Sequence, residues 1–121
     1  MNDFLKILSR EVDNPDHIYL YYENGNWYAY EQSACRLKQA VDECFIQQVI
    51  NLTYEVVLVR ARISGQCLEA ELGDFLTAST GVLVCDTHIE IPLRWQSHVL
   101  FDRWKSAELK TKLQCIELER A

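Results

Sequence analysis

The chain has 121 residues, of which 49% are hydrophobic and 25% are charged, and its formal net charge is −6. We expect a single domain over residues 1–121, because a chain of this length can bury one core without disulfides or metals. The negative charge argues against non-specific nucleic-acid binding, which depends on neutralising phosphates, but it leaves room for a local basic patch.

Targeting signals and metal-binding patterns are not found in the sequence. No apolar run approaches the ~20 residues of a membrane span, and the N-terminus lacks the basic and apolar regions of a secretion signal. The five cysteines include no CxxC pair, and the three histidines show neither HxH nor HExxH spacing. We therefore expect a cytoplasmic protein with reduced cysteines, no membrane partner, no metal and no cofactor.

The chain begins with a helical pattern. Leu5, Leu8 and Val12 recur at the spacing of one helix face, which predicts a helix over residues 3–12 with these side chains in the core. Asn14-Pro15-Asp16 ends this helix, because the residue before a proline avoids helical geometry.

Two strand-like runs follow, residues 17–23 and 26–32, joined by Asn24-Gly25, the preferred pair for a two-residue hairpin turn. This turn sets a register in which Tyr21 faces Tyr28. One hairpin face then carries apolar side chains: Ile18, Leu20, Tyr22, Trp27 and Ala29. The other face carries two tyrosine pairs: Tyr21 with Tyr28 and Tyr19 with Tyr30. The tyrosine face could be a stacking platform for flat ligands, a surface covered by a helix, or a dimer contact.

A second helix is predicted over residues 33–44, with Ser33 as its cap. Its core stripe consists of Ala34, Leu37, Val41 and Cys44. Residues 45–52, which come next, fit either a strand or a loop.

Residues 53–63 are rich in β-branched side chains and predict a central strand, with Arg60 and Arg62 on one of its faces. Arginines are unusual on such a strand, so this end should reach solvent or an acidic partner. Further strands are expected over three runs: 67–72, 82–85 and 88–91.

Residues 95–119 fit a helix whose apolar face changes direction. Leu109, Leu113 and Ile116 fall on a different side from the apolar residues before Ser106. Either the helix breaks near Ser106, or its last turns contact something other than the first core. We therefore expect a homo-oligomer or another protein partner, with these three side chains in the interface.

The hairpin and its flanking helices resemble the start of the MutS mismatch-recognition domain. In that family a Gly-Asp-Phe-Tyr-Glu turn is followed by Asp-Ala at the start of a helix, and Gly25-Asn26-Trp27-Tyr28 and Ser33-Ala34 hold similar places here. The resemblance covers about residues 1–44 and implies an α-β-β-α start, with Trp27 in the place of the aromatic that stacks on the mismatched base. Ala29 stands where the family has the glutamate that hydrogen-bonds the base.

Basic side chains extend the aromatic face into a candidate nucleic-acid surface. Residues 94–112 carry five basic and two acidic side chains, although the whole chain is acidic. The candidate binding residues are Tyr19, Tyr21, Trp27, Tyr28, Tyr30, Arg60, Arg62, Arg103 and Lys105. A third kind of site is a thiol–imidazole pair, because Cys85 and His88 could face each other across a hairpin turn.

These patterns predict an α+β domain, in which an antiparallel or mixed sheet of about five strands packs with two or three helices. The first functional hypothesis is a binding or adaptor module without catalysis that self-associates. The alternative is a nucleic-acid-associated protein that uses the tyrosine face and the basic C-terminal stretch. An enzyme with a site at Cys85 and His88 is the third.

Overall fold

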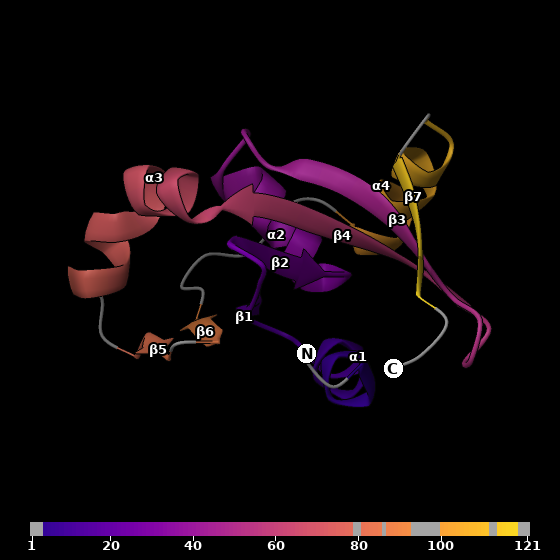
Figure 1. Ribbon diagram of the computed structural model, residues 1–121, viewed down its shortest axis with the longest axis horizontal. Coiled ribbons are helices and arrows are strands. Elements are labelled where there is room, and N and C mark those ends of the chain that lie inside the picture. Colours follow the sequence, from indigo (N-terminus) through magenta and orange to yellow (C-terminus); the bar gives the residue numbers. More distant parts are fainter. Residues whose placement is uncertain (1–3, 79–80, 86, 93–99, 112–113, 119–121) are drawn as a thin grey trace.

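A mixed β-sheet runs through the molecule in the computed structural model, which describes residues 4–78, 81–85, 87–92, 100–111 and 114–118 (Figure 1). The helices of these residues are α1 (Phe4–Val12), α2 (Gln32–Ala40), α3 (Gly65–Ala78) and α4 (Phe101–Leu109). The strands are β1 (His17–Glu23), β2 (Asn26–Tyr30), β3 (Phe45–Asn51), β4 (Val56–Ser64), β5 (Leu83–Val84), β6 (His88–Pro92) and β7 (Gln114–Leu118). The expected α+β class is confirmed.

The described strands form one seven-stranded sheet in the order β5-β6-β1-β2-β4-β3-β7. Neighbouring strands are antiparallel except for β7, which runs parallel to β3. The long strand β4 lies inside the sheet, between β2 and β3, as its β-branched composition predicts.

The turn between β1 and β2 has the predicted geometry, with positive φ at Asn24 (51°) and Gly25 (84°). The predicted register is confirmed next to the turn, where Tyr21 lies opposite Tyr28. The expected pairing of Tyr19 with Tyr30 is wrong, because the backbone N–H of Tyr19 donates instead to Ser33 Oγ at 2.9 Å. The two strands thus separate away from the turn.

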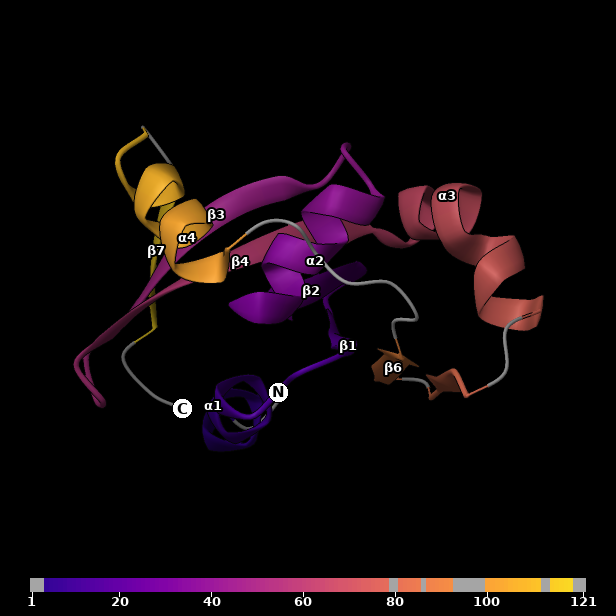
Figure 2. The ribbon, with the colours of Figure 1, turned by 180° about the vertical axis from the view of Figure 1, so that it is seen from behind.

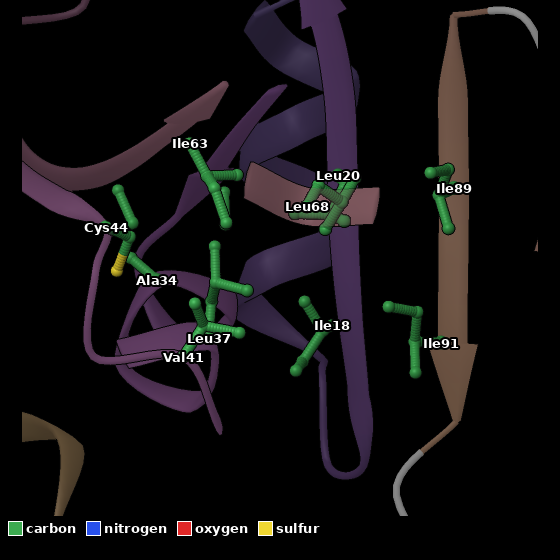
Figure 3. Packing of buried hydrophobic residues seen from close by; sticks show 12 residues of the cluster. Ile18, Leu20, Ala34, Leu37, Val41, Cys44, Ile63, Leu68, Ile89 and Ile91 are labelled. Atoms are coloured by element: carbon green, nitrogen blue, oxygen red, sulfur yellow. The ribbon is translucent and has the colours of Figure 1, made fainter. Parts of the chain in front are cut away.

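One face of the sheet packs against α2 and α3 and contributes Ile18, Leu20, Ile63, Ile89 and Ile91 to the larger core. Figure 3 shows these side chains gathered with those of the two helices. The four residues of the predicted stripe, Ala34, Leu37, Val41 and Cys44, are all buried, but the predicted helix over residues 33–44 is too long, because α2 ends at Ala40. Ser33 is not the cap, since Glu31 holds that position without a side-chain cap bond.

The opposite face of the sheet packs against α1, where Phe4 and Ile7 form a second core with the tyrosines. Figure 2 shows α2 and α4 together in front of the sheet and α1 apart from them at the bottom. The helix was predicted correctly, but its core face was not. Leu5 and Val12 are 50% and 83% exposed, whereas Glu11 is only 3% exposed because its carboxylate is hydrogen-bonded inside.

The predicted strand over residues 67–72 is wrong, since these residues belong to α3. Their apolar alternation fits a strand, but Leu68 and Leu72 are also one helical turn apart, and both pack against the larger core. These residues therefore form a helix, because its apolar face can pack against the core beside β4.

The predicted helix over residues 95–119 is found only at Phe101–Leu109, and its residues 95–99 lie outside the described part of the chain. Helix α4 ends at Leu109, and after a turn the chain forms β7, in which Ile116 lies opposite Val49 of β3. Leu109 is half-buried, and Leu113 lies outside the described residues. The apolar pattern changes direction because the chain changes from helix to strand. The inferred interface of Leu109, Leu113 and Ile116 depended on one continuous helix, so it loses its support.

Candidate functional site

The tyrosine face of the hairpin continues across the sheet as a row of aromatic and basic side chains. Strand register places five side chains side by side in this row: Phe45 (β3), Arg62 (β4), Tyr28 (β2), Tyr21 (β1) and His88 (β6). The guanidinium carbon of Arg62 lies 5.2 Å from the Phe45 ring centroid, a cation–π contact. We call these five residues the cross-strand row.

A second arginine lies beside this row. The guanidinium of Arg60 donates to Gln47 Oε1 at 2.7 Å and to the Tyr30 hydroxyl at 3.4 Å, and lies 4.3 Å from the Tyr28 ring centroid. Arg60 is only 8% exposed. Neither Arg60 nor Arg62 forms an ion pair with a carboxylate among the side chains that the structure describes. A buried guanidinium without a counter-ion makes this part of the face attractive to anions.

Helix α1 covers only part of the tyrosine face. Tyr21 and Tyr30 are buried beneath it, while Tyr19 and Tyr28 are half-buried. Burial raises the pKa of Tyr21 to about 12, although Arg10 donates a hydrogen bond to its hydroxyl. Of the three readings of the tyrosine face, a surface covered by a helix therefore describes Tyr21 and Tyr30, and a stacking platform could include only Tyr19 and Tyr28.

The other end of the row is open. Phe45 is 64% exposed, and Arg62 and Tyr28 are partly exposed. We call Phe45, Arg62 and Tyr28, together with the buried Arg60 that lies over the Tyr28 ring, the open end of the face. The expectation that this end of the strand reaches solvent fits Arg62, which is partly exposed, but not Arg60, which is buried.

The other predicted binding residues lie elsewhere. Trp27 is on the opposite face of the sheet, where it packs on the larger core and meets Tyr22 edge-on at a centroid distance of 5.1 Å. Arg103 is exposed on α4, and Lys105 of the same helix forms an ion pair with Glu31. The structure thus brings Arg60 and Arg62 to the tyrosines, but not the basic residues of α4.

The predicted thiol–imidazole pair is not assembled. His88 stacks on Tyr21 at a centroid distance of 5.6 Å, and its Nε2 lies 3.3 Å from Arg10. Burial and the nearby Arg10 charge lower the pKa of His88. Cys85 is exposed, and within the described residues no hydrogen bond joins its thiol to this imidazole.

Glu31, which the sequence analysis did not single out, connects β2 directly to α2. Its backbone has φ 52° and ψ −116°, a conformation that only glycine adopts readily. A strained backbone of this kind costs about 1–3 kcal/mol, and such residues cluster at functional sites. The strain is held by the flanking elements, because the Glu31 N–H donates to the Val59 carbonyl and its own carbonyl accepts from the Cys35 N–H.

The side chain of Glu31 is also unusual. It is 8% exposed, and its Oε1 accepts a hydrogen bond from Lys105 Nζ at 2.6 Å. Its Oε2 is buried and has no hydrogen-bond partner. Burial raises the pKa of this carboxyl, while Lys105 acts in the opposite direction.

A second buried carboxylate, Glu11, joins α1 to the start of α2. Its oxygens accept from Ser33 N–H, Ser33 Oγ and Asn14 Nδ2 at 2.6–3.2 Å. Burial raises the pKa of Glu11, and these hydrogen bonds together with the charge of Arg36 lower it. No local pattern reveals this residue, because Glu11 lies on the polar face of the predicted helix and Ser33 is far away in the chain.

The described residues show neither a metal-binding cluster nor a membrane-spanning helix. Among the described residues, no group of three or more His, Cys, Asp or Glu side chains could hold a metal ion. No helix of the described residues is both long and apolar enough to cross a membrane.

Comparison with family models, curated proteins and solved structures finds no match for this chain.

Proposed function

We propose that this protein is a binding module without catalysis, and that its ligand is single-stranded nucleic acid held at the open end of the tyrosine face. The observation that carries the proposal is the buried Arg60 guanidinium, which has no carboxylate partner among the described side chains and lies over the Tyr28 ring, two residues from Arg62 on the same face of β4. A phosphate bound by Arg62 would place a negative charge near the Arg60 guanidinium, which has no carboxylate partner among the described side chains.

The neighbouring rings supply a second kind of contact. Phe45 and Tyr28 flank Arg62 in adjacent strands, so bases on either side of one phosphate could stack on them. Stacking of a base on an aromatic side chain contributes about 1–3 kcal/mol and requires an unpaired base. The site therefore favours single strands over duplexes.

The geometry does not support every earlier expectation. Mismatch recognition as implied by the MutS resemblance is not part of the proposal, because Trp27 lies on the opposite sheet face. Self-association has lost the continuous helix on which it depended, and the proposed site does not require a second copy. The cytoplasmic location stays a prediction.

The proposal is tested by fluorescence anisotropy with a labelled oligothymidylate at low salt. Arg62→Gln and Phe45→Ala should each weaken binding by about fivefold or more, because each removes a phosphate or stacking contact. Arg103→Gln removes the same charge from an exposed position on α4 and should leave the affinity unchanged.

Two results would contradict the proposal. One is an oligothymidylate affinity that Arg62→Gln and Phe45→Ala leave unchanged. The other is an equal loss of affinity for Arg62→Gln and Arg103→Gln, which would indicate a general charge effect. Far-UV circular dichroism of each variant separates a lost site from a lost fold.

A further inference from the structure

A groove lies between α1 and α4, over the first residues of β4. Its walls are apolar and come from Leu8 and Val12 of α1, Val56 and Leu58 of β4, and Phe101 of α4. The cavity volume is about 510 Å³, which is within the range of pockets that hold small organic molecules. The groove is therefore large enough for a ligand with an apolar body.

Glu31 and Lys105 form the polar part of this groove. Lys105 occupies only Oε1 of the carboxylate, and the buried Oε2 has no partner. A buried acceptor without a hydrogen bond is rare in native proteins, and here it coincides with a strained backbone at the same residue. Both costs are explained if Oε2 accepts from a donor on a ligand, which requires the Glu31 carboxylate to turn towards the groove, because Oε2 is buried in the structure.

The charges around the groove indicate which donor fits. Among the described residues that line it, Glu11, Glu31 and Asp102 are acidic and only Lys105 is basic. Both oxygens of Glu11 already accept hydrogen bonds from Ser33 and Asn14, and Asp102 is exposed to water, so the buried acceptor without a partner is Glu31 Oε2. A positively charged donor would complete this hydrogen bond and reduce the excess of negative charge.

We propose that the groove is a binding site for a small organic ammonium ion, in which the N–H group donates to Glu31 Oε2 and an apolar body packs between α1 and Phe101. This site is independent of the open end of the tyrosine face, since it shares no residue with it and has the opposite charge. The two proposals can therefore fail separately.

The experiment is an NMR titration of the full ¹⁵N-labelled chain with 2-phenylethylammonium chloride at neutral pH. We expect saturable shifts at the amides of Glu31, Leu58 and Phe101. The uncharged analogue 2-phenylethanol should bind about tenfold more weakly, because a hydrogen bond from a charged donor is stronger than one from a neutral donor. The anion phenylacetate should not bind.

Two variants locate the binding in the groove. Glu31→Gln removes the charge with little change of shape and should weaken binding about tenfold or more. Glu43→Gln removes the same charge from an exposed carboxylate between α2 and β3 and should bind like the wild type. Val12→Trp, at an 83% exposed groove position, should block the site without disturbing the core.

The proposal is overturned if no saturable shifts occur at millimolar probe. It is equally overturned if the shifts lie away from the groove, or if both Glu31→Gln and Val12→Trp bind the probe as tightly as the wild type. If Glu31→Gln does not fold, Val12→Trp decides, because Val12 makes no core contact that folding requires.

Discussion

The backbone of Glu31 has a positive φ of 52° between β2 and α2, where glycine would be far less strained than glutamate. Glu31→Gly should therefore raise the free energy of unfolding by about 1 kcal/mol, because relief of strain exceeds the added chain entropy of glycine. Urea denaturation measures this difference. Gln32→Gly, one residue further into α2, is the matched control and should lower stability by about 1 kcal/mol. A loss of stability for Glu31→Gly equal to that of the control would contradict the backbone strain at Glu31.

Glu11 provides a pH-dependent test. Burial raises its pKa in the folded state, so the folded chain binds this proton more tightly than the unfolded chain. The resulting stabilisation is present at low pH and is lost as pH rises through the raised pKa. Relative to Glu11→Gln, the wild type should lose stability as pH rises from the ordinary titration range of a glutamate carboxyl through the raised pKa of Glu11.

Urea denaturation across this pH range measures the stability difference between the wild type and Glu11→Gln. Glu69→Gln is the control, since it makes the same substitution at an exposed glutamate of α3. A constant difference for Glu11→Gln, or one of opposite slope, would show that the buried carboxylate is not the cause.

Single residues differ in how far the sequence predicts them. The position of Tyr21 opposite Tyr28 follows from Asn24-Gly25 alone, because this turn has one preferred geometry. The shared face of Arg60 and Arg62 follows from strand alternation. The strained backbone of Glu31 cannot be predicted from the sequence, because it arises only when packing fixes both β2 and α2 and leaves one residue between them.

Helix α1 shows how an element can be predicted while its orientation is not. The apolar pattern marks the face of Leu5, but burial of Glu11 through Ser33 turns Ile7 towards the tyrosines. Ile7→Ala should therefore cost about 2–4 kcal/mol of stability, as expected for truncation in a core. Leu5→Ala, at a half-exposed position, should cost about 0.5 kcal/mol or less.

Chemical denaturation of the two alanine variants distinguishes these orientations of α1. An equal cost for Leu5→Ala and Ile7→Ala would contradict the observed packing. A greater cost for Leu5→Ala would restore the face that the sequence pattern indicated.

The C-terminal elements were predicted less well than the hairpin. The spacing of Leu109, Leu113 and Ile116 fits a helix, and nothing local reveals that β3 offers an edge for a parallel strand. The partner strand lies more than sixty residues earlier in the chain, so the decisive contact is non-local. A hairpin, by contrast, has its partner next to it, which is why its register was predictable.

At the scale of the whole molecule, a chain of net charge −6 presents a basic region on one sheet face and an acidic groove elsewhere. Glu23 lies on the same face as Tyr21, near the hairpin turn, and opposes the binding of an anion at the open end. Glu23→Gln should therefore strengthen oligothymidylate binding by about two- to threefold at low salt.

Anisotropy titrations at two salt concentrations measure this effect. Affinity should fall as salt rises, and the difference between Glu23→Gln and the wild type should shrink with it. Glu69→Gln, an exposed carboxylate in α3, should have a smaller effect. A salt-independent affinity would show that phosphate contacts do not carry the binding.

The most direct test of the proposed function is the position of the nucleic acid on the protein. In an NMR titration of the ¹⁵N-labelled chain with oligothymidylate, the largest shifts should occur at Tyr28, Phe45 and Arg62. Shifts concentrated at Arg103 in α4 or at Trp27 on the opposite sheet face, or no shifts at low salt, would contradict the account.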